Sequence, residues 1–353
     1  MKFLLLLLLF VPAAIGAEHL HASPLVVFVL AALGIVPLSG FLGKATEEIA
    51  AYTGPTLGGL LNATLGNMAE LIIAVLALRA GLVDLVKASI TGSILGNLLL
   101  VLGLAQLLGG LRHKVQRFNI NLAGLSISLL VMAVIGLVIP ALFHSTHVDP
   151  TRELTRRVSI GVAALLIAGY ALSLLYSMGT HKSVFVEVSD VANEEHEESH
   201  APWSKRKSIV VLLASAAFVG WLSEILVGST EEAIKHLGLS QIFVGLIIVP
   251  IIGNAAEHSS AVLMAMRNRM DLSVSIAIGS SAQVALLIAP ILVFVGLAFG
   301  QPMDLAFSAF EVVSVALAVA VAAAVVRDAE SNWLEGAFLL LVYGMLGVAF
   351  FYF

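Results

Sequence analysis

The chain has 353 residues, of which 59% are hydrophobic and only 12% are charged, and its mean hydropathy is +1.03. Soluble domains are about half apolar and about a quarter charged, so this composition excludes a soluble globular enzyme. The net charge of -5 leaves no basic face for nucleic acid. The chain has no cysteine, which excludes thiol catalysis, disulfides and thiolate metal ligands.

The hydrophobic residues gather into blocks of about 20 residues, the length that crosses roughly 30 Å of hydrocarbon as a helix. This pattern predicts an all-α integral membrane protein with ten core transmembrane helices. Residues 3–15 form a further Leu-rich run after Lys2 that ends in small residues, so residues 1–18 resemble a secretory signal peptide and are either cleaved or an eleventh, short helix. In chain order, the core helices are expected at residues 24–42, 56–78, 88–111, 118–143, 158–180, 208–230, 239–266, 272–303, 305–326 and 336–353.

The positions of Lys and Arg predict the orientation, because cytoplasmic loops collect these residues. Alternate loops on the side of Lys2 hold 12 of the 18 basic residues. We therefore expect a multi-pass protein of the cytoplasmic membrane, with its C-terminus outside. The acidic linker, residues 181–207, would then lie in the cytoplasm.

The acidic linker divides the core into residues 24–180 and 208–353, each with five predicted helices. A shift of 187 residues superposes Asn67 on Asn254 and Glu70 on Glu257, within one ungapped register of about 30 residues. Because each half has an odd number of helices, homologous halves insert with opposite orientations. The sequence therefore predicts two inverted five-helix repeats.

Two acids lie near the middle of spans that carry no other charge, Glu70 and Glu257. A carboxylate there costs at least ~2.5 kcal/mol and persists only beside water, a partner or a cation. Asn67 and Asn254 precede these acids by three residues, so each Asn is expected to share a helix face with its Glu. A glycine before each Asn, and Pro250 in the second copy, predict broken helices that release backbone carbonyls.

Two companion segments add neutral oxygen donors at matching depth. The first contains Ser93 and Asn97, and the second contains Ser280 and Gln283. The ligand inventory is therefore all oxygen, which suits Ca²⁺, a hard cation that takes six to eight oxygens in a flexible geometry. His258 is the only histidine in the middle of a core span, so a nitrogen-rich transition-metal site is not expected.

These segments resemble the cation/proton exchanger family of Ca²⁺/H⁺ antiporters, within the cation/Ca²⁺ exchanger superfamily. The resemblance rests on the Gly-Asn-x-Ala-Glu segments at residues 66–70 and 253–257, on His258, and on Gly-Ser-x-x-Gln at residues 279–283. It implies that the first and sixth core helices are long mobile gates, and that Glu70 and Glu257 bind Ca²⁺ and H⁺ in alternation. It also implies that the site is completed by Asn67, Asn254, Ser93, Ser280, Asn97 and Gln283.

We therefore predict a Ca²⁺/H⁺ antiporter that exports cytosolic Ca²⁺ by alternating access and needs no cofactor beyond its transported ions. The candidates for proton transfer are Glu70, Glu257 and His258. Two titratable acids without a third suit proton coupling, because protonating both removes the charge that holds a divalent ion. Membrane lipid is the expected surrounding partner, and self-association is left open.

Two alternatives remain. The sodium/calcium exchanger branch typically has a proline before the glutamate and further acids in the companion helices, and this chain has neither. An intramembrane hydrolase could use Glu257 and His258 to activate water, but it needs one asymmetric site rather than matched halves. One departure from symmetry is that Asn97 and Gln283 are not equivalent under the shift.

Other acids have less specific interpretations. Glu224 and Glu311 lie within spans but lack repeat counterparts, which favours an aqueous cavity or an interface. The pairs at residues 47–48 and 231–232 fall at helix ends, where a solvated terminus and a cation-attracting vestibule are both open. The run at residues 194–200 is interpreted as a solvated linker, with a metal-sensing element as the alternative.

Overall fold

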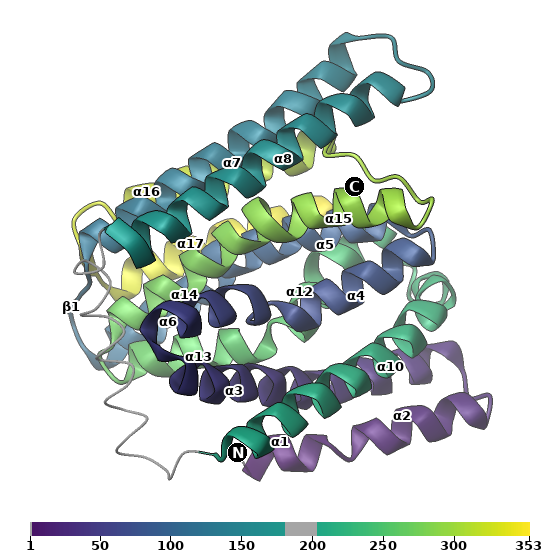
Figure 1. Cartoon of the computed structure of the whole chain (residues 1–353), viewed down its shortest axis with the longest axis horizontal. Helices are drawn as coiled ribbons and strands as arrows, with labels where there is room; N and C mark the ends of the chain where they lie inside the picture. Colours follow the sequence, from purple (N-terminus) through teal and green to yellow (C-terminus); the bar gives the residue numbers. More distant parts are fainter. Residues whose placement is uncertain (1, 181–202) are drawn as a thin grey trace. The chain divides into compact units, whose positions relative to one another are not determined.

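The computed structural model describes residues 2–180 and 203–353, so the acidic run at residues 194–200 lies outside the described residues. The described chain is almost entirely helical, as expected (Figure 1). Its helices, with π-helical turns written η, are α1 (Lys2–Leu7), α2 (Phe10–His19), α3 (Pro24–Leu65), α4 (Met68–Arg79), α5 (Val83–Leu95), η1 (Gly96–Val101), α6 (Leu102–Arg112), α7 (Ile120–Thr146), α8 (Glu153–Leu175), η2 (Tyr176–Thr180), α10 (Lys205–Leu237), α11 (Gln241–Phe243), η3 (Val244–Ile248), α12 (Val249–Gly253), α13 (Ala255–Met266), α14 (Met270–Gln283), η4 (Val284–Ile288), α15 (Ala289–Ala298), α16 (Ala309–Val325) and α17 (Trp333–Phe351).

The chain forms two compact units. Unit 1 comprises Met1–Ser89, Ser189–Glu257 and Phe353, and unit 2 comprises Ile90–Val188 and His258–Tyr352. Each unit thus takes segments from both sequence halves.

Unit 1 is built around the two longest helices, α3 with 42 residues and α10 with 33 residues, which pack along one another (Figure 1). Gly34 permits this approach, because a Cβ atom there would lie 2.7 Å from Cδ1 of Leu222 on α10. The N-terminal helix α2 packs on α3 and buries Val11 and Ala14. Both central helices exceed the roughly 20 residues needed to cross the hydrocarbon.

The predicted breaks at the Gly-Asn segments are confirmed. Helix α3 ends at Leu65 and α4 begins at Met68, and Asn67 between them has non-helical backbone angles. In the second copy, α12 ends at Gly253 and α13 begins at Ala255, with Asn254 at the break. Helices α4 and α13 begin at residues 68 and 255 and end at residues 79 and 266, which is the 187-residue shift at both ends.

The two companion segments lie in long helices. The first companion helix, Val83–Arg112, runs through α5, η1 and α6, and the second, Met270–Ala298, runs through α14, η4 and α15. Both contain a π-helical turn at nearly equivalent positions, since η1 starts at residue 96 and η4 at residue 284. Such turns widen the helix locally and are frequent at functional sites.

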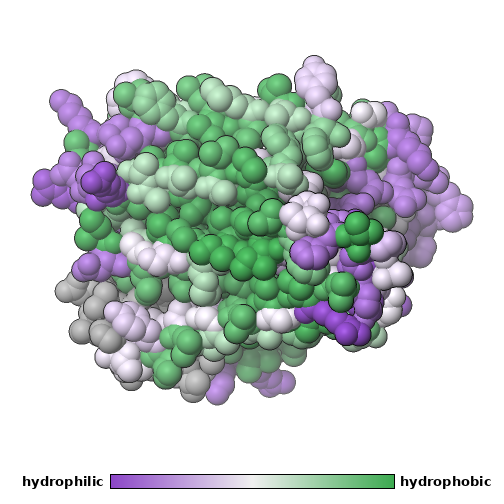
Figure 2. Space-filling model, turned by 90° about the horizontal axis from the view of Figure 1, so that it is seen from above, coloured by the Kyte–Doolittle hydropathy of each residue, from purple (hydrophilic) through white to green (hydrophobic). Residues whose placement is uncertain are grey.

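Within the described residues, seven helices are long and apolar enough to cross a membrane, or eight if the helix pair interrupted at Asn254 counts as one span. Ten were expected. The second expected span is interrupted at Asn67, and the ninth is the 17-residue α16, preceded by a non-helical segment. The number ten therefore stays a prediction. On the face shown in Figure 2, hydrophobic side chains predominate and hydrophilic ones gather at the edges.

One short β pairing departs from the all-helical expectation. Strands β1 (Gln116–Arg117) and β2 (Glu330–Ser331) pair antiparallel in unit 2. The Arg117 guanidinium also meets the Glu330 carboxylate at 3.1 Å. The pairing gives hydrogen-bond partners to the backbone of two interhelical loops in which Gln116 and Ser331 are buried.

Candidate functional site

Unit 1 contains four of the predicted ligands, all at the two helix breaks. Glu70 lies in the first turn of α4 and Glu257 in the first turn of α13. Both side chains are half-buried, whereas Asn67 and Asn254 are each only 2% exposed. The positive end of a helix dipole favours a carboxylate in the first turn, so each break supplies a favourable position for negative charge.

The two breaks contact each other across the repeat. The Asn254 amide donates a hydrogen bond from Nδ2 to Oε1 of Glu70, the acid of the other copy. A Cβ atom on Gly253 would lie 3.0 Å from Cγ of Glu70, and one on Gly66 would lie 3.5 Å from Oε1 of Glu257. Each glycine of a Gly-Asn break therefore lies against the glutamate of the opposite copy. The sequence predicted only that each Asn shares a helix face with its own Glu, and it did not predict this contact across the repeat.

Unit 2 contains the other four predicted ligands and His258. Ser93 lies on α5 and Asn97 in the π-helical turn η1, whereas Ser280 and Gln283 lie on α14. The Nε2 atom of His258 lies 3.0 Å from Oδ1 of Asn97, so these two side chains are hydrogen-bonded. Helix α14 packs against η1. The eight predicted ligands thus fall four in each unit, and their joint coordination of one ion stays a prediction.

No group of three or more His, Asp or Glu side chains suited to a metal occurs in residues 2–180 and 203–353. A cation held by Glu70 and Glu257 would therefore draw its remaining ligands from neutral oxygens. Ca²⁺ accepts such amide, hydroxyl and carbonyl oxygens readily.

Glu224 lies beside a groove, although its predicted position at an aqueous cavity or an interface stays a prediction. It is exposed on α10 and lines a groove of about 410 Å³ in unit 1. The other lining residues are apolar or glycine, namely Leu71, Ile72, Val75, Leu76 and Gly220. The groove provides one acid and no other charged side chain.

The pair at residues 47–48 does not lie at a helix end as predicted but inside α3, which continues to Leu65, and Glu48 is buried there. Its side chain is only 8% exposed, and Oε2 accepts a hydrogen bond of 2.9 Å from the backbone N–H of Trp203. The Tyr52 hydroxyl donates to the Trp203 carbonyl at 2.5 Å, and the ammonium groups of Lys44 and Lys207 lie 5.1 and 4.4 Å from the centre of the indole ring. These contacts of Trp203 hold the start of α10 against α3. Glu231 and Glu232, by contrast, are exposed at the end of α10.

Comparison with known proteins identifies the family of this chain. The sodium/calcium exchanger protein family matches residues 23–179 and 207–352, and the chain belongs to this family. A Ca²⁺/H⁺ antiporter of Aphanothece halophytica is 46% identical over 98% of this chain and 95% of its own length. The Ca²⁺/H⁺ antiporter ChaA of Bacillus subtilis is 41% identical over 99% of this chain and 98% of its own length.

A crystal structure of the Ca²⁺/H⁺ antiporter protein YfkE superposes on the whole chain and on all of that protein with a TM-score of 0.85 at 36% identity. Family membership and the long apolar helices together establish a multi-pass membrane protein.

Proposed function

We propose that this protein is a Ca²⁺/H⁺ antiporter that moves Ca²⁺ out of the cytosol in exchange for protons. The observation that carries the proposal is the crossed arrangement of Glu70 with the Gly253–Asn254 break and of Glu257 with Gly66. Relatives over nearly the full chain are Ca²⁺/H⁺ antiporters, which supports the same function. The protein is accordingly a transporter, not the intramembrane hydrolase considered above.

The chemistry follows from charge balance. Two ionised carboxylates neutralise one divalent cation, and two protonated carboxyls carry no charge that could retain it. Each state leaves the site nearly neutral, which lowers the cost of holding it within the membrane. Ca²⁺ and protons therefore compete for Glu70 and Glu257, and this competition couples their movements.

The remaining ligands complete the oxygen shell in this proposal. Asn67 and Asn254 lie at the breaks, and Ser93, Asn97, Ser280 and Gln283 lie on the companion helices. His258 passes protons near Asn97, with which it is hydrogen-bonded. The matched bounds of α4 and α13 support two five-helix repeats of inverted orientation, with ten core helices and the N-terminal helix as an eleventh.

The proposed orientation places the acidic linker in the cytoplasm and the C-terminus outside the cytoplasmic membrane. The bias of Lys and Arg toward one set of loops supports it. In this orientation the inward proton gradient drives Ca²⁺ export.

Uptake into everted membrane vesicles tests the function. Vesicles with an acid interior are expected to accumulate radioactive Ca²⁺, and a protonophore that collapses the pH gradient should abolish the accumulation. Vesicles from cells without the protein are the control. Undiminished uptake driven by a Na⁺ gradient alone would assign the protein to sodium-coupled exchange instead.

A further inference from the structure

Glu311 is a buried acid that the exchange mechanism does not use. It lies in the first turn of α16 in unit 2 and is 5% exposed. Its Oε2 atom accepts hydrogen bonds from the backbone N–H and the hydroxyl of Ser308, at 3.0 and 2.8 Å. The Glu311 backbone N–H in turn donates to the Ser308 hydroxyl oxygen at 3.2 Å. Hydrogen bonds and the helix N-terminus together stabilise the charged carboxylate without a bound cation.

The second carboxylate oxygen of Glu311 reaches another helix. Oε1 accepts a hydrogen bond of 3.3 Å from the hydroxyl of Thr91, which is 1% exposed on α5. The capping hydrogen bonds use only Oε2, so the contact of Oε1 with Thr91 is not required for capping α16. Thr91 precedes Ser93 by two residues and Asn97 by six on the same companion helix.

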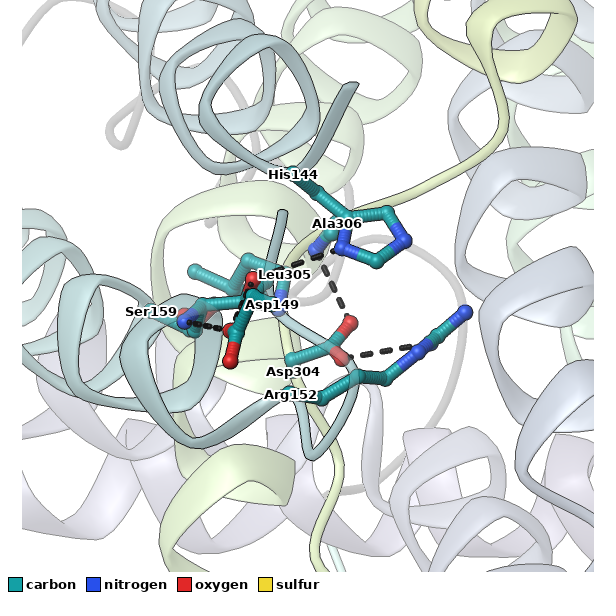
Figure 3. A network of polar contacts seen from close by, with 8 residues as sticks. His144, Asp149, Arg152, Ser159, Asp304, Leu305 and Ala306 are labelled. Carbon is teal, nitrogen blue, oxygen red and sulfur yellow. Dashed lines mark hydrogen bonds and ion pairs between the residues drawn. The ribbon is translucent and has the colours of Figure 1, made fainter. Parts of the chain in front are cut away.

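The segment that leads into Glu311 is itself fixed. Residues 301–308 are not helical, yet Met303 and Leu305 are fully buried. Because this segment has no helical hydrogen bonds, its backbone N–H groups donate to side-chain oxygens instead. The Leu305 N–H donates to Ser159 Oγ at 3.0 Å, and the Ala306 N–H donates to Asp304 Oδ1 at 3.0 Å (Figure 3). Buried backbone groups without helical partners need such hydrogen bonds.

Helix α8 anchors this segment through Ser159, and the turn before α8 anchors it through Arg152, whose guanidinium lies 3.4 Å from Oδ2 of Asp304 (Figure 3). Because Glu311 follows directly after a segment fixed in this way, its carboxylate is a stationary point. The hydrogen bond from the Thr91 hydroxyl to this carboxylate therefore restricts both sliding of α5 along its axis and rotation of α5 about its axis.

We propose that Glu311 is a positioning residue that, through Thr91, holds the first companion helix in the register at which Ser93 and Asn97 bind the transported cation. The tether belongs to one copy only, because the 187-residue shift places Gly124 opposite Glu311 and Ile278 opposite Thr91. This agrees with the inequivalence of Asn97 and Gln283 in the two companion helices. The inference rests on the proposed function and adds a determinant of Ca²⁺ affinity to it.

The decisive variant is Thr91→Val, which keeps the shape of the side chain and removes only the hydroxyl. We expect it to raise the KM for Ca²⁺ by about three- to tenfold, the scale of one buried hydrogen bond, with Vmax held within about twofold. The pH dependence of Vmax at saturating Ca²⁺ should not change, because Thr91 carries no proton in exchange. Thr91→Ser keeps the hydroxyl and should have the KM of the unmodified protein. If Thr91→Val does not fold, Thr91→Ala should show the same rise in KM.

Ser308→Ala is the matched control, because it removes the hydroxyl of the capping box and leaves the Thr91 contact. It should lower the unfolding temperature while the KM stays within twofold. In a double-mutant cycle, Glu311→Gln should add little to the KM of Thr91→Val.

An unchanged KM in a folded Thr91→Val protein would overturn the proposal. A displaced pH profile of Vmax at saturating Ca²⁺, or a Ser308→Ala variant with the same rise in KM, would also overturn it. Proton-driven uptake by the unmodified protein, measured alongside, separates a failure of this inference from a failure of the proposed function.

Discussion

Gly253 lies where one helix break meets the carboxylate of the opposite repeat. Its hypothetical Cβ atom is 3.0 Å from Cγ of Glu70, closer than side-chain atoms ordinarily pack, while alanine is otherwise well suited to the helix end. A methyl group at this position must therefore displace the Glu70 side chain by a few tenths of an ångström.

We predict that Gly253→Ala lowers the initial rate of Ca²⁺ uptake by about fivefold or more, because small displacements of a reacting group are costly. Gly228→Ala on α10 is the control, since nothing lies within 4 Å of a Cβ atom there, and it should transport within twofold of the unmodified protein. Equal rates for both variants would show that the contact with Glu70 does not constrain the site.

At the scale of single residues, the sequence predicted site candidates where a residue that is costly within the membrane also recurs in both repeats. Glu70 and Glu257 stand out because an intramembrane acid is expensive and because both recur in one register. The pairings of Thr91 with Glu311 and of Glu48 with Trp203 span 220 and 155 residues. No local spacing predicts such long-range partners, since they depend on how separate helices pack.

At the scale of elements, the Gly-Asn breaks were predicted and the π-helical turns were not. Two of these turns do have a signal, because η3 is followed by Pro250 and η4 by Pro290. A proline lacks the N–H that continues the helical ladder and crowds the carbonyl four residues earlier, which favours a wider turn upstream. The turn η1 has no such proline, so its position follows from packing alone.

The turn before α8 supplies a pH-dependent prediction outside the membrane spans. The Asp149 carboxylate accepts hydrogen bonds from the Thr155 N–H at 2.8 Å and from the Thr155 hydroxyl at 2.9 Å. The backbone hydrogen bond from Thr155 holds the pKa of Asp149 below its usual value of 3.8. A lowered pKa means that the carboxylate stabilises the fold above the unfolded pKa and that this contribution is lost as the pH falls through the folded pKa.

We therefore predict that Asp149→Asn unfolds at a lower temperature than the unmodified protein at neutral pH. The difference should shrink as the pH falls below 3.8 and through the lowered pKa of the native carboxyl, because that carboxyl then becomes protonated as well. Thermal unfolding of the purified protein in detergent at both pH values is the measurement. A difference that is equal at both pH values would assign the effect to shape rather than charge.

At the scale of the whole molecule, the helical class and the membrane setting could be predicted from the sequence, because composition and hydrophobic periodicity determine them. The organisation in two inverted repeats stays a prediction. It could not show that each compact unit takes segments from both halves. The boundaries between the units lie at residues 89/90 and 257/258, so each copy contributes its Asn and Glu to unit 1 and its companion helix largely to unit 2. The local hydrophobic pattern does not show which segments of the two halves pack into the same unit.

The central claim is that two repeat-related carboxylates together exchange Ca²⁺ for protons. Simultaneous measurement of Ca²⁺ uptake and proton release in proteoliposomes containing Glu70→Gln or Glu257→Gln tests it most directly, with Glu224→Gln as the control. Glutamine keeps the shape and removes both the charge and the titration, so each site variant should lose both fluxes to a similar degree, while the corresponding Glu→Asp variants retain part and Glu224→Gln is milder. Normal transport by Glu70→Gln beside an inactive Glu257→Gln would contradict the two-carboxylate mechanism and leave a single site at Glu257 and His258.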